Sequence, residues 1–206
     1  MKKYILYNLL SYFFGYFLVF SSLAFAESIL DITEGEFVIG DENAPITIIE
    51  YASLSCGHCA DFHINRLPNL IEEFIDTGKA KIVFRDFPFN YPALLGSMVL
   101  RCVPEDIRYE YSNALYQLQS RWVVQENAES KKELYKIMQS GGMTKEKFNE
   151  CIDNVDLENE ILNGLMAAQS EFNIKSTPSF LINGILIEGN KTIKDFRQII
   201  DKILSE

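Results

Sequence analysis

The sequence predicts an α/β fold in which an all-helical segment interrupts a sheet domain. A run rich in β-branched residues at 46–51 and a second strand pattern at 79–87, centred on Ile82-Val83-Phe84, flank a helical pattern of about twenty residues. This is the order of a right-handed βαβ unit with parallel strands. Strand signals are weak in residues 93–173 and return at 179–188. With 206 residues, 48% of them hydrophobic, the chain can bury a sizeable core without needing disulfides to fold.

The N-terminus has the layout of a secretory signal peptide. Lys2 and Lys3 precede a mostly apolar stretch, residues 4–20, and Ala24-Phe25-Ala26 forms a small-residue cleavage pattern. We therefore expect residues 1–26 to be a cleaved signal peptide. The alternative is a retained membrane anchor, since the apolar stretch is long enough to span a bilayer.

The mature chain is acidic. Cleavage after residue 26 would remove two lysines and no acidic residue, so the formal charge becomes 17 − 29 = −12. An acidic surface argues against nucleic acid as a partner.

Residues 27–92 hold the first part of the sheet domain. A short edge strand is expected at 36–40, before a turn that ends at Pro45. The helix that follows the central strand should run from Cys56 to Asp76, with a kink at Pro68.

Residues 93–173 form the helical insertion, and residues 174–206 complete the sheet domain. Helical spacing of apolar residues predicts five segments, at 93–102, 106–123, 130–139, 144–153 and 156–172. After the insertion, Asn183-Gly184 between two apolar runs indicates a β-hairpin, and 192–204 is a closing amphipathic helix.

Four cysteines remain after cleavage: Cys56, Cys59, Cys102 and Cys151. Outside the cytosol their disulfides can persist. Cys56 and Cys59 are so close in sequence that they should pair with each other, which leaves a structural disulfide between Cys102 and Cys151. The alternative for the second pair is two buried free thiols, which behave as small hydrophobic groups.

The Cys56-Gly57-His58-Cys59 motif lies where a strand ends and a helix begins. Unpaired backbone N–H groups and the helix dipole favour a thiolate there. Cys56 is therefore the expected nucleophile, Cys59 the resolving thiol, and the imidazole of His58 a further group that lowers the pKa of Cys56. The alternative is a purely structural disulfide.

Two other polar residues lie near this motif in the sequence. Glu50 is close to the end of a strand that otherwise reads as buried, where a carboxylate is costly unless it is paired or protonated. His63 is seven residues past Cys56, and we expect it to be a surface or packing residue.

Together, these features resemble those of the DsbA-like thiol:disulfide oxidoreductases. The shared features are the Cys56-Gly57-His58-Cys59 motif at a strand-to-helix junction, Thr177-Pro178 before a hairpin, and a helical insertion between them. The resemblance covers nearly all of the mature chain and implies a thioredoxin-like fold interrupted by an all-helical insertion.

The resemblance also implies roles and partners. Glu50 would be a buried proton acceptor for Cys59, the alternative being a solvent-facing position. Thr177 and Pro178 would form an X–cis-Pro loop that binds a substrate strand, the alternative being an ordinary trans proline. The chain would act in the periplasm on reduced secreted proteins or peptides, without a cofactor, and a membrane quinone-linked protein would reoxidise it.

Two rival functions stay open at this point. A disulfide isomerase or reductase can use the same fold, but such relatives usually oligomerise through an added N-terminal segment. Only about twenty residues separate Glu27 from the central strand, so we expect a monomer. The second rival is a metal-binding thiol protein, which lacks a further cysteine-rich pair to close its site; we expect no metal.

Overall fold

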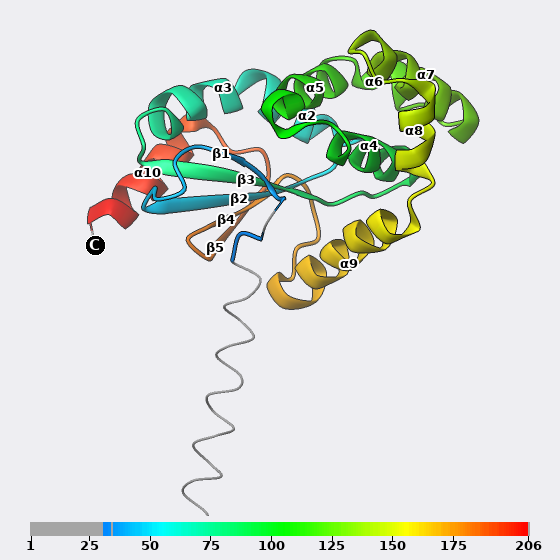
Figure 1. Cartoon of the computed structure of the whole chain (residues 1–206). Coiled ribbons are helices and arrows are strands. Elements are labelled where there is room, and N and C mark those ends of the chain that lie inside the picture. Colours follow the sequence, from blue (N-terminus) through cyan, green and yellow to red (C-terminus); the bar gives the residue numbers. More distant parts are fainter. Residues whose placement is uncertain (1–30, 34, 206) are drawn as a thin grey trace, which may run out of the picture. The chain divides into compact units, whose positions relative to one another are not determined.

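A computed structural model describes residues 31–33 and 35–205. The expected signal peptide, residues 1–26, lies outside the described residues. Residues 37–206 form one structural unit, built on a five-stranded sheet with the order β1-β3-β2-β4-β5 (Figure 1). The strands are β1 (Phe37–Ile39), β2 (Ile46–Ala52), β3 (Ala80–Asp86), β4 (Ser179–Ile182) and β5 (Ile185–Glu188).

Most of the remaining chain is helical. The helices are α2 (Gly57–Asn65), α3 (Leu67–Leu70), the π-helical η1 (Ile71–Ile75), α4 (Tyr91–Arg101), α5 (Glu105–Gln117), α6 (Gln119–Trp122), α7 (Asn127–Ser140), α8 (Lys145–Ile152), α9 (Val155–Phe172) and α10 (Ile193–Ser205). In Figure 1, α2 and α3 lie on one side of the sheet and α9 on the other.

The sheet confirms the predicted βαβ unit. β2 is the central strand, parallel to β3 and antiparallel to β4, and β1 is an antiparallel edge strand on β3. The predicted hairpin is also present, with Asn183 and Gly184 both at positive φ (45° and 84°), the conformation that a two-residue hairpin turn requires. The thioredoxin-like fold with its helical insertion is therefore confirmed.

The long helix predicted after the central strand is broken rather than kinked. α2 ends at Asn65, Arg66 leaves the helical region at φ −124°, and Pro68 lies in the first turn of α3. A proline has no N–H to donate into a helix but is favoured in a first turn, so it starts a new helix here. The segment predicted at 106–123 is likewise divided, at Leu118.

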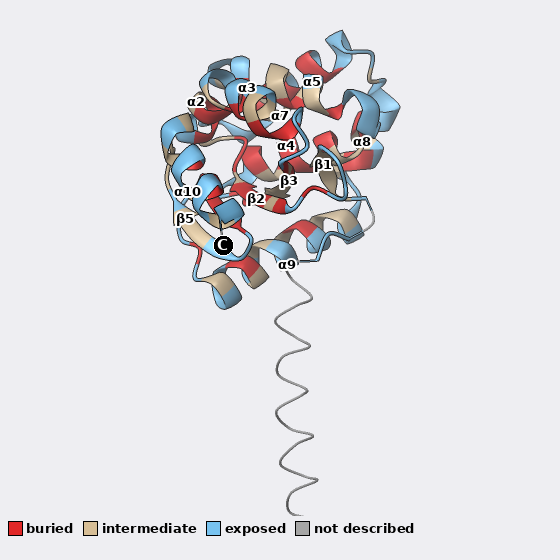
Figure 2. Ribbon diagram, turned by 90° about the vertical axis from the view of Figure 1, so that its left-hand side faces the viewer, coloured by how far each residue is buried: buried red, intermediate tan, exposed pale blue. Residues whose placement is uncertain are grey.

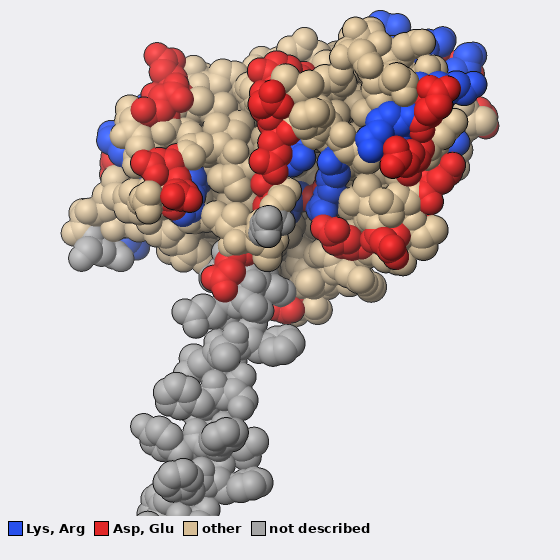
Figure 3. Space-filling view, in the orientation of Figure 1, with Lys and Arg blue, Asp and Glu red and all other residues tan. Residues whose placement is uncertain are grey.

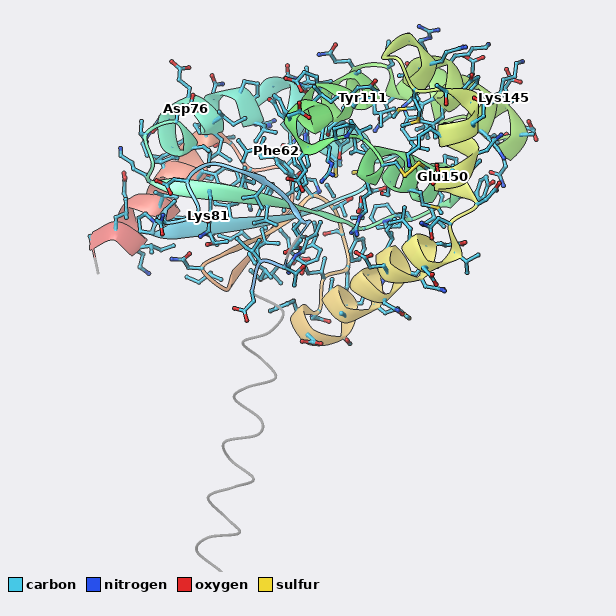
Figure 4. The ribbon with its side chains drawn as sticks, viewed as in Figure 1. Phe62, Asp76, Lys81, Tyr111, Lys145 and Glu150 are labelled. Carbon is cyan, nitrogen blue, oxygen red and sulfur yellow. A yellow bond between two sulfur atoms is a disulfide. The ribbon has the colours of Figure 1, made fainter. Side chains whose placement is uncertain are left out.

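Buried residues form two hydrophobic clusters (Figure 2). The sheet cluster joins β2, β3 and β4 to α2, α3 and α10. Phe62 of α2, labelled in Figure 4, is fully buried in this cluster, and its ring contacts Phe180 and Phe196. The helical cluster contains most buried side chains of α4–α9, and it also includes Cys59 and Leu54. The core of the insertion therefore reaches the cysteine motif.

A disulfide joins two helices of the insertion. Cys102 follows the last turn of α4 and Cys151 lies in α8, with their Cα atoms 6.2 Å apart; Figure 4 shows the bond in yellow. The structural disulfide between Cys102 and Cys151 that the sequence predicts is therefore present.

The charged surface is mixed. Acidic groups are distributed over the face drawn in Figure 3, with lysines and arginines between them. Within the described residues, no helix combines the length and the apolar character needed to cross a membrane.

Gly96 lets α4 pack closely on the insertion core. A Cβ at this position would lie 2.8 Å from Trp122 Cη2 and 3.0 Å from Leu54 Cδ1, both on buried side chains. We predict that Gly96→Ala lowers the free energy of unfolding by about 1–3 kcal/mol because it overpacks the site. At the matched helical position Gly164 an added Cβ meets nothing within 4 Å, so Gly164→Ala should instead gain up to about 1 kcal/mol. Denaturant unfolding of both variants tests this; equal effects would contradict it.

The Cys102–Cys151 bridge closes a loop with a sequence separation of 49. On the chain-entropy account, replacing both cysteines with alanine should lower the free energy of unfolding by about 4 kcal/mol. Denaturant unfolding measures the loss, and intact mass after alkylation of the native, oxidised protein counts the thiols. Two alkylated thiols at these positions would contradict the bridge.

Candidate active site

Cys56 lies at the N-cap of α2, one residue before its first helical residue. Its extended backbone (φ −86°, ψ 120°) turns the chain from the end of β2 into the helix. No side chain caps this helix end, so the first N–H groups of α2 remain available to the Cys56 sulfur. The local sequence thus places a thiol where a negative charge is favoured.

The pKa of Cys56 is lowered from 9.0 to about 5. The largest cause is a hydrogen bond from the Cys59 thiol, and the backbone N–H groups of Cys59 and His58 add to it, while partial burial opposes the shift. Thr177 also favours the thiolate; its hydroxyl is buried and has no other hydrogen-bond partner among the residues that the structure describes. At neutral pH Cys56 is therefore a thiolate.

Cys59 has the opposite character. It lies one helical turn further along α2 and is fully buried. Burial is the main reason that its pKa is raised far above the ordinary value, and the hydrogen bond to Cys56 and the negative charges of Glu50 and Cys56 raise it further. The proton of the reduced pair is therefore held on Cys59.

Glu50 is fully buried in the centre of the sheet. In register it lies between Phe84 of β3 and Phe180 of β4. Its Oε2 is 3.0 Å from Nε2 of His63, which is an ion-pair distance, although the two groups are not aligned as a hydrogen bond. The solvent-facing alternative for Glu50 is excluded by this burial.

Of the two roles expected for His63, surface or packing, the structure confirms packing. His63 is only 2% exposed, and its ring stacks on Tyr116 of α5 with the ring centroids 4.2 Å apart. It is therefore packed, and its Nε2 is also the polar atom 3.0 Å from Oε2 of Glu50. The spacing of seven residues shows from the sequence that His63 lies on the same face of the helix as Cys56. The sequence does not show that this face points into the core.

His58 contributes through its backbone. Its side chain is exposed, and the group that lowers the Cys56 pKa is its N–H at the start of the helix. The sequence had assigned this effect to the imidazole.

Thr177 and Pro178 lie beside Cys56, 121 residues away in sequence. The Cys56 sulfur lies 3.4 Å from the carbonyl oxygen of Thr177, and the Thr177–Pro178 peptide bond is cis. The fold therefore brings together Cys56, Cys59, Glu50 and this loop, while the Cys102–Cys151 bridge lies within the insertion.

Gln119 is a site residue that the sequence did not reveal. From the start of α6 its Nε2 donates to the carbonyl oxygens of Leu54 and Cys56, at 2.9 and 3.0 Å. The insertion thus holds the loop that carries the nucleophile. A lone glutamine at the end of a helical pattern gives no sequence signal for such a contact.

Comparison with known proteins agrees with this geometry. The family model described as thioredoxin matches residues 32–202. The crystal structure of Wolbachia pipientis alpha-DsbA1 is 31% identical, with a TM-score of 0.79, over 86% of this chain and 94% of that one. The chain belongs to the DsbA-like thiol:disulfide oxidoreductases of the thioredoxin family.

Other DsbA-like relatives are more distant. A protein of Rickettsia bellii whose name contains the words protein-disulfide oxidoreductase is 28% identical over 176 residues, which are 85% of this chain and 67% of that protein. The share is 62–64% for four other rickettsial relatives, so the chain spans about two thirds of their length. BdbD of Bacillus subtilis, at 21% identity and a TM-score of 0.73 over 84% of this chain and 95% of that one, shares the fold.

The acidity of Cys56 can be measured directly. We predict that the ultraviolet thiolate absorbance of the reduced protein titrates with a midpoint of about 5. Cys56→Ser should remove this transition, and Cys59→Ala should move it upward, because the Cys59 thiol is the largest cause of the low pKa. A midpoint near the unperturbed value of about 8.5 would contradict the assignment.

The same shift makes the stability of the reduced protein depend on pH. Folding lowers the pKa of Cys56, so ionisation of this thiol adds to the free energy of unfolding. This contribution is complete above about pH 9, falls as the pH decreases, and is absent below about pH 5. The oxidised protein has no thiol at this position and should lack this component, so the difference between the two unfolding curves isolates it.

Proposed function

We propose that this protein is a thiol oxidase that transfers a Cys56–Cys59 disulfide to reduced secreted proteins. The supporting observation is the opposite shift of two pKa values in one helix turn, lowered at Cys56 and raised at Cys59. Stabilising the thiolate stabilises the reduced enzyme and makes its disulfide a strong oxidant. At pH 7, lowering a thiol pKa from 9.0 to about 5 favours the reduced form about a hundredfold.

The proposed reaction has two exchanges. A substrate thiolate attacks the Cys56 sulfur, the Cys56–Cys59 bond breaks, and Cys59 leaves and takes up a proton. The second substrate thiolate then attacks the substrate sulfur of the mixed disulfide, and Cys56 leaves as a thiolate. The substrate loses two electrons and two protons; the enzyme gains both electrons and one proton, and the other proton goes to solvent. A low pKa makes Cys56 a good leaving group in the second exchange.

Thr177 and Pro178 are the proposed substrate-binding loop. The backbone of Thr177 approaches the Cys56 sulfur, so a substrate strand that pairs with this backbone would present its cysteine to the nucleophile. Two exposed aromatic residues, Phe89 in the loop after β3 and Tyr91 at the start of α4, are candidates for further peptide contacts.

The cellular setting is part of the proposal. The N-terminal sequence pattern supports export to the periplasm, where disulfides persist. Each turnover leaves the enzyme reduced, so a membrane quinone-linked protein is the proposed reoxidising partner, and we propose that the enzyme acts as a monomer.

Redox assays distinguish the oxidase from its rivals. We predict that the reduced form dominates at equilibrium with a glutathione buffer, that reduced ribonuclease is oxidised rapidly, and that insulin is reduced poorly. Cys56→Ala should abolish exchange, whereas Cys59→Ala should accumulate mixed disulfides because the intramolecular resolving thiol is gone. Efficient recovery of scrambled ribonuclease would identify an isomerase, and fast insulin reduction a reductase.

A further inference from the structure

One side-chain amide of the helical insertion binds two carbonyl groups of the cysteine loop, residues 53–56. Nε2 of Gln119 donates to the carbonyl oxygen of Leu54 at 2.9 Å and to that of Cys56 at 3.0 Å. An amide nitrogen carries two hydrogens, so each carbonyl group can take one of them. The two carbonyl oxygens therefore face the same atom, which restricts the conformation of Ser55 between them.

The part of the insertion that carries this amide is firmly anchored. Gln119 is the first residue of α6, and the side chain of Trp122 in the same short helix is fully buried. Nε1 of Trp122 donates to the carbonyl oxygen of Leu115 at 2.9 Å, and the Trp122 carbonyl accepts from the buried hydroxyl of Ser130 in α7. Both bonds lie within the insertion. The position of the Gln119 amide is thus set independently of the cysteines.

The junction between the loop and α2 needs such support. Cys56 is followed by Gly57, whose backbone has more freedom than that of any other residue type. A Cβ at Gly57 would meet nothing within 4 Å among the described residues, so no side-chain packing holds this position. The Cys56 carbonyl accepts from the N–H of Ala60 inside the helix at 3.0 Å and from Gln119 outside it. Gln119 is therefore the contact from outside the helix that fixes the plane of the Cys56–Gly57 peptide.

The orientation of this peptide decides what the Cys56 sulfur can reach. Backbone N–H groups of His58 and Cys59 stabilise a negative charge on the sulfur, and the Thr177 carbonyl oxygen is 3.4 Å away from it. Hydrogen bonds weaken steeply when their angles change. A rotation about the backbone bonds of Cys56 would move the sulfur away from the helix N–H groups, and the thiolate would lose part of its stabilisation.

We propose that Gln119 is a positioning residue of the thiol–disulfide exchange: by binding the carbonyl groups of Leu54 and Cys56, it holds the Cys56 sulfur at the N-terminus of α2 and keeps the disulfide a strong oxidant. This inference rests on the proposed function and deepens it. It gives the helical insertion a part in setting the redox equilibrium of two cysteines that it does not carry. Gln119 acts through the backbone and takes no part in bond making or proton transfer.

The equilibrium with glutathione measures this role. Two molecules of glutathione give two electrons to the Cys56–Cys59 bond, the bond breaks, and one glutathione disulfide forms. Of the two glutathione protons, one goes to Cys59 and one to solvent, because Cys56 is a thiolate at pH 7. The equilibrium constant for reduction therefore increases with the stability of that thiolate.

Gln119→Met removes both bonds, because a methionine side chain has a similar length and no hydrogen to donate. Once the loop can move, we expect the ultraviolet thiolate absorbance of Cys56 to titrate about one pH unit above the wild-type midpoint of about 5. The equilibrium constant for reduction by glutathione at pH 7 should fall about tenfold, since each unit in the pKa of Cys56 changes this constant by about that factor.

Thr144→Ala is the matched control. Thr144 caps α8 by accepting from the N–H of Lys147 at 3.2 Å, so its loss destabilises the insertion without removing a bond to the cysteine loop. This variant should keep the wild-type midpoint and equilibrium constant. A shift of both quantities in Q119M that is absent from T144A supports the inference. Wild-type values in a less stable Q119M, or an equal shift in T144A, overturn it, because Gln119 would then only attach the insertion.

A second variant covers the case in which Q119M does not fold. Gln119→Asn keeps the amide on a side chain that is one methylene shorter, so the amide cannot reach both carbonyl groups as before and the midpoint should also rise. An unchanged midpoint in this variant overturns the inference. The titration needs no substrate. Failure of the wild-type protein to oxidise reduced ribonuclease would refute the proposed function, and the titration would still decide whether Gln119 holds the Cys56 sulfur.

Discussion

The site depends on a change of environment across one turn of α2. At the N-cap, Cys56 is reached by free backbone N–H groups and by the Cys59 thiol, so a negative charge is stabilised. One turn further, Cys59 is enclosed by the core, and a charge there would be desolvated and repelled by its neighbours. One helix therefore carries both a low-pKa thiol, Cys56, which is a good leaving group, and a high-pKa thiol, Cys59, which keeps its proton. Stabilising the thiolate of Cys56 in this way makes the disulfide easy to reduce.

The helical insertion completes this environment rather than lying apart from it. Its hydrophobic cluster includes Cys59 and Leu54, Gln119 holds two carbonyl groups of the cysteine loop, and Tyr116 covers His63. The sheet domain supplies the strand end and the helix N-terminus. The insertion supplies the burial that makes the two thiols different.

Local patterns in the sequence predicted much of this arrangement. The strands, the hairpin at Asn183-Gly184 and the position of Cys56 follow from β-branched runs, turn residues and spacing, which act over a few residues. The break at Arg66 was predicted only as a kink, because Pro68 is compatible with either outcome until the packing of α3 is known. Contacts across the fold, such as that of Gln119 with the cysteine loop, depend on how the insertion packs, which no local pattern encodes.

The Glu50–His63 pair is better explained by the chemistry of the site than by folding. A central strand position between Phe84 and Phe180 would accept an apolar side chain without the desolvation of two ionisable groups, and replacing a buried ion pair in this way is often neutral or stabilising. The pair lies instead where the charge of Glu50 reaches Cys59 and raises its pKa. His63 is buried on the same helix as the cysteines, with its Nε2 3.0 Å from Oε2 of Glu50, so the carboxyl group has a polar neighbour in an otherwise apolar part of the core.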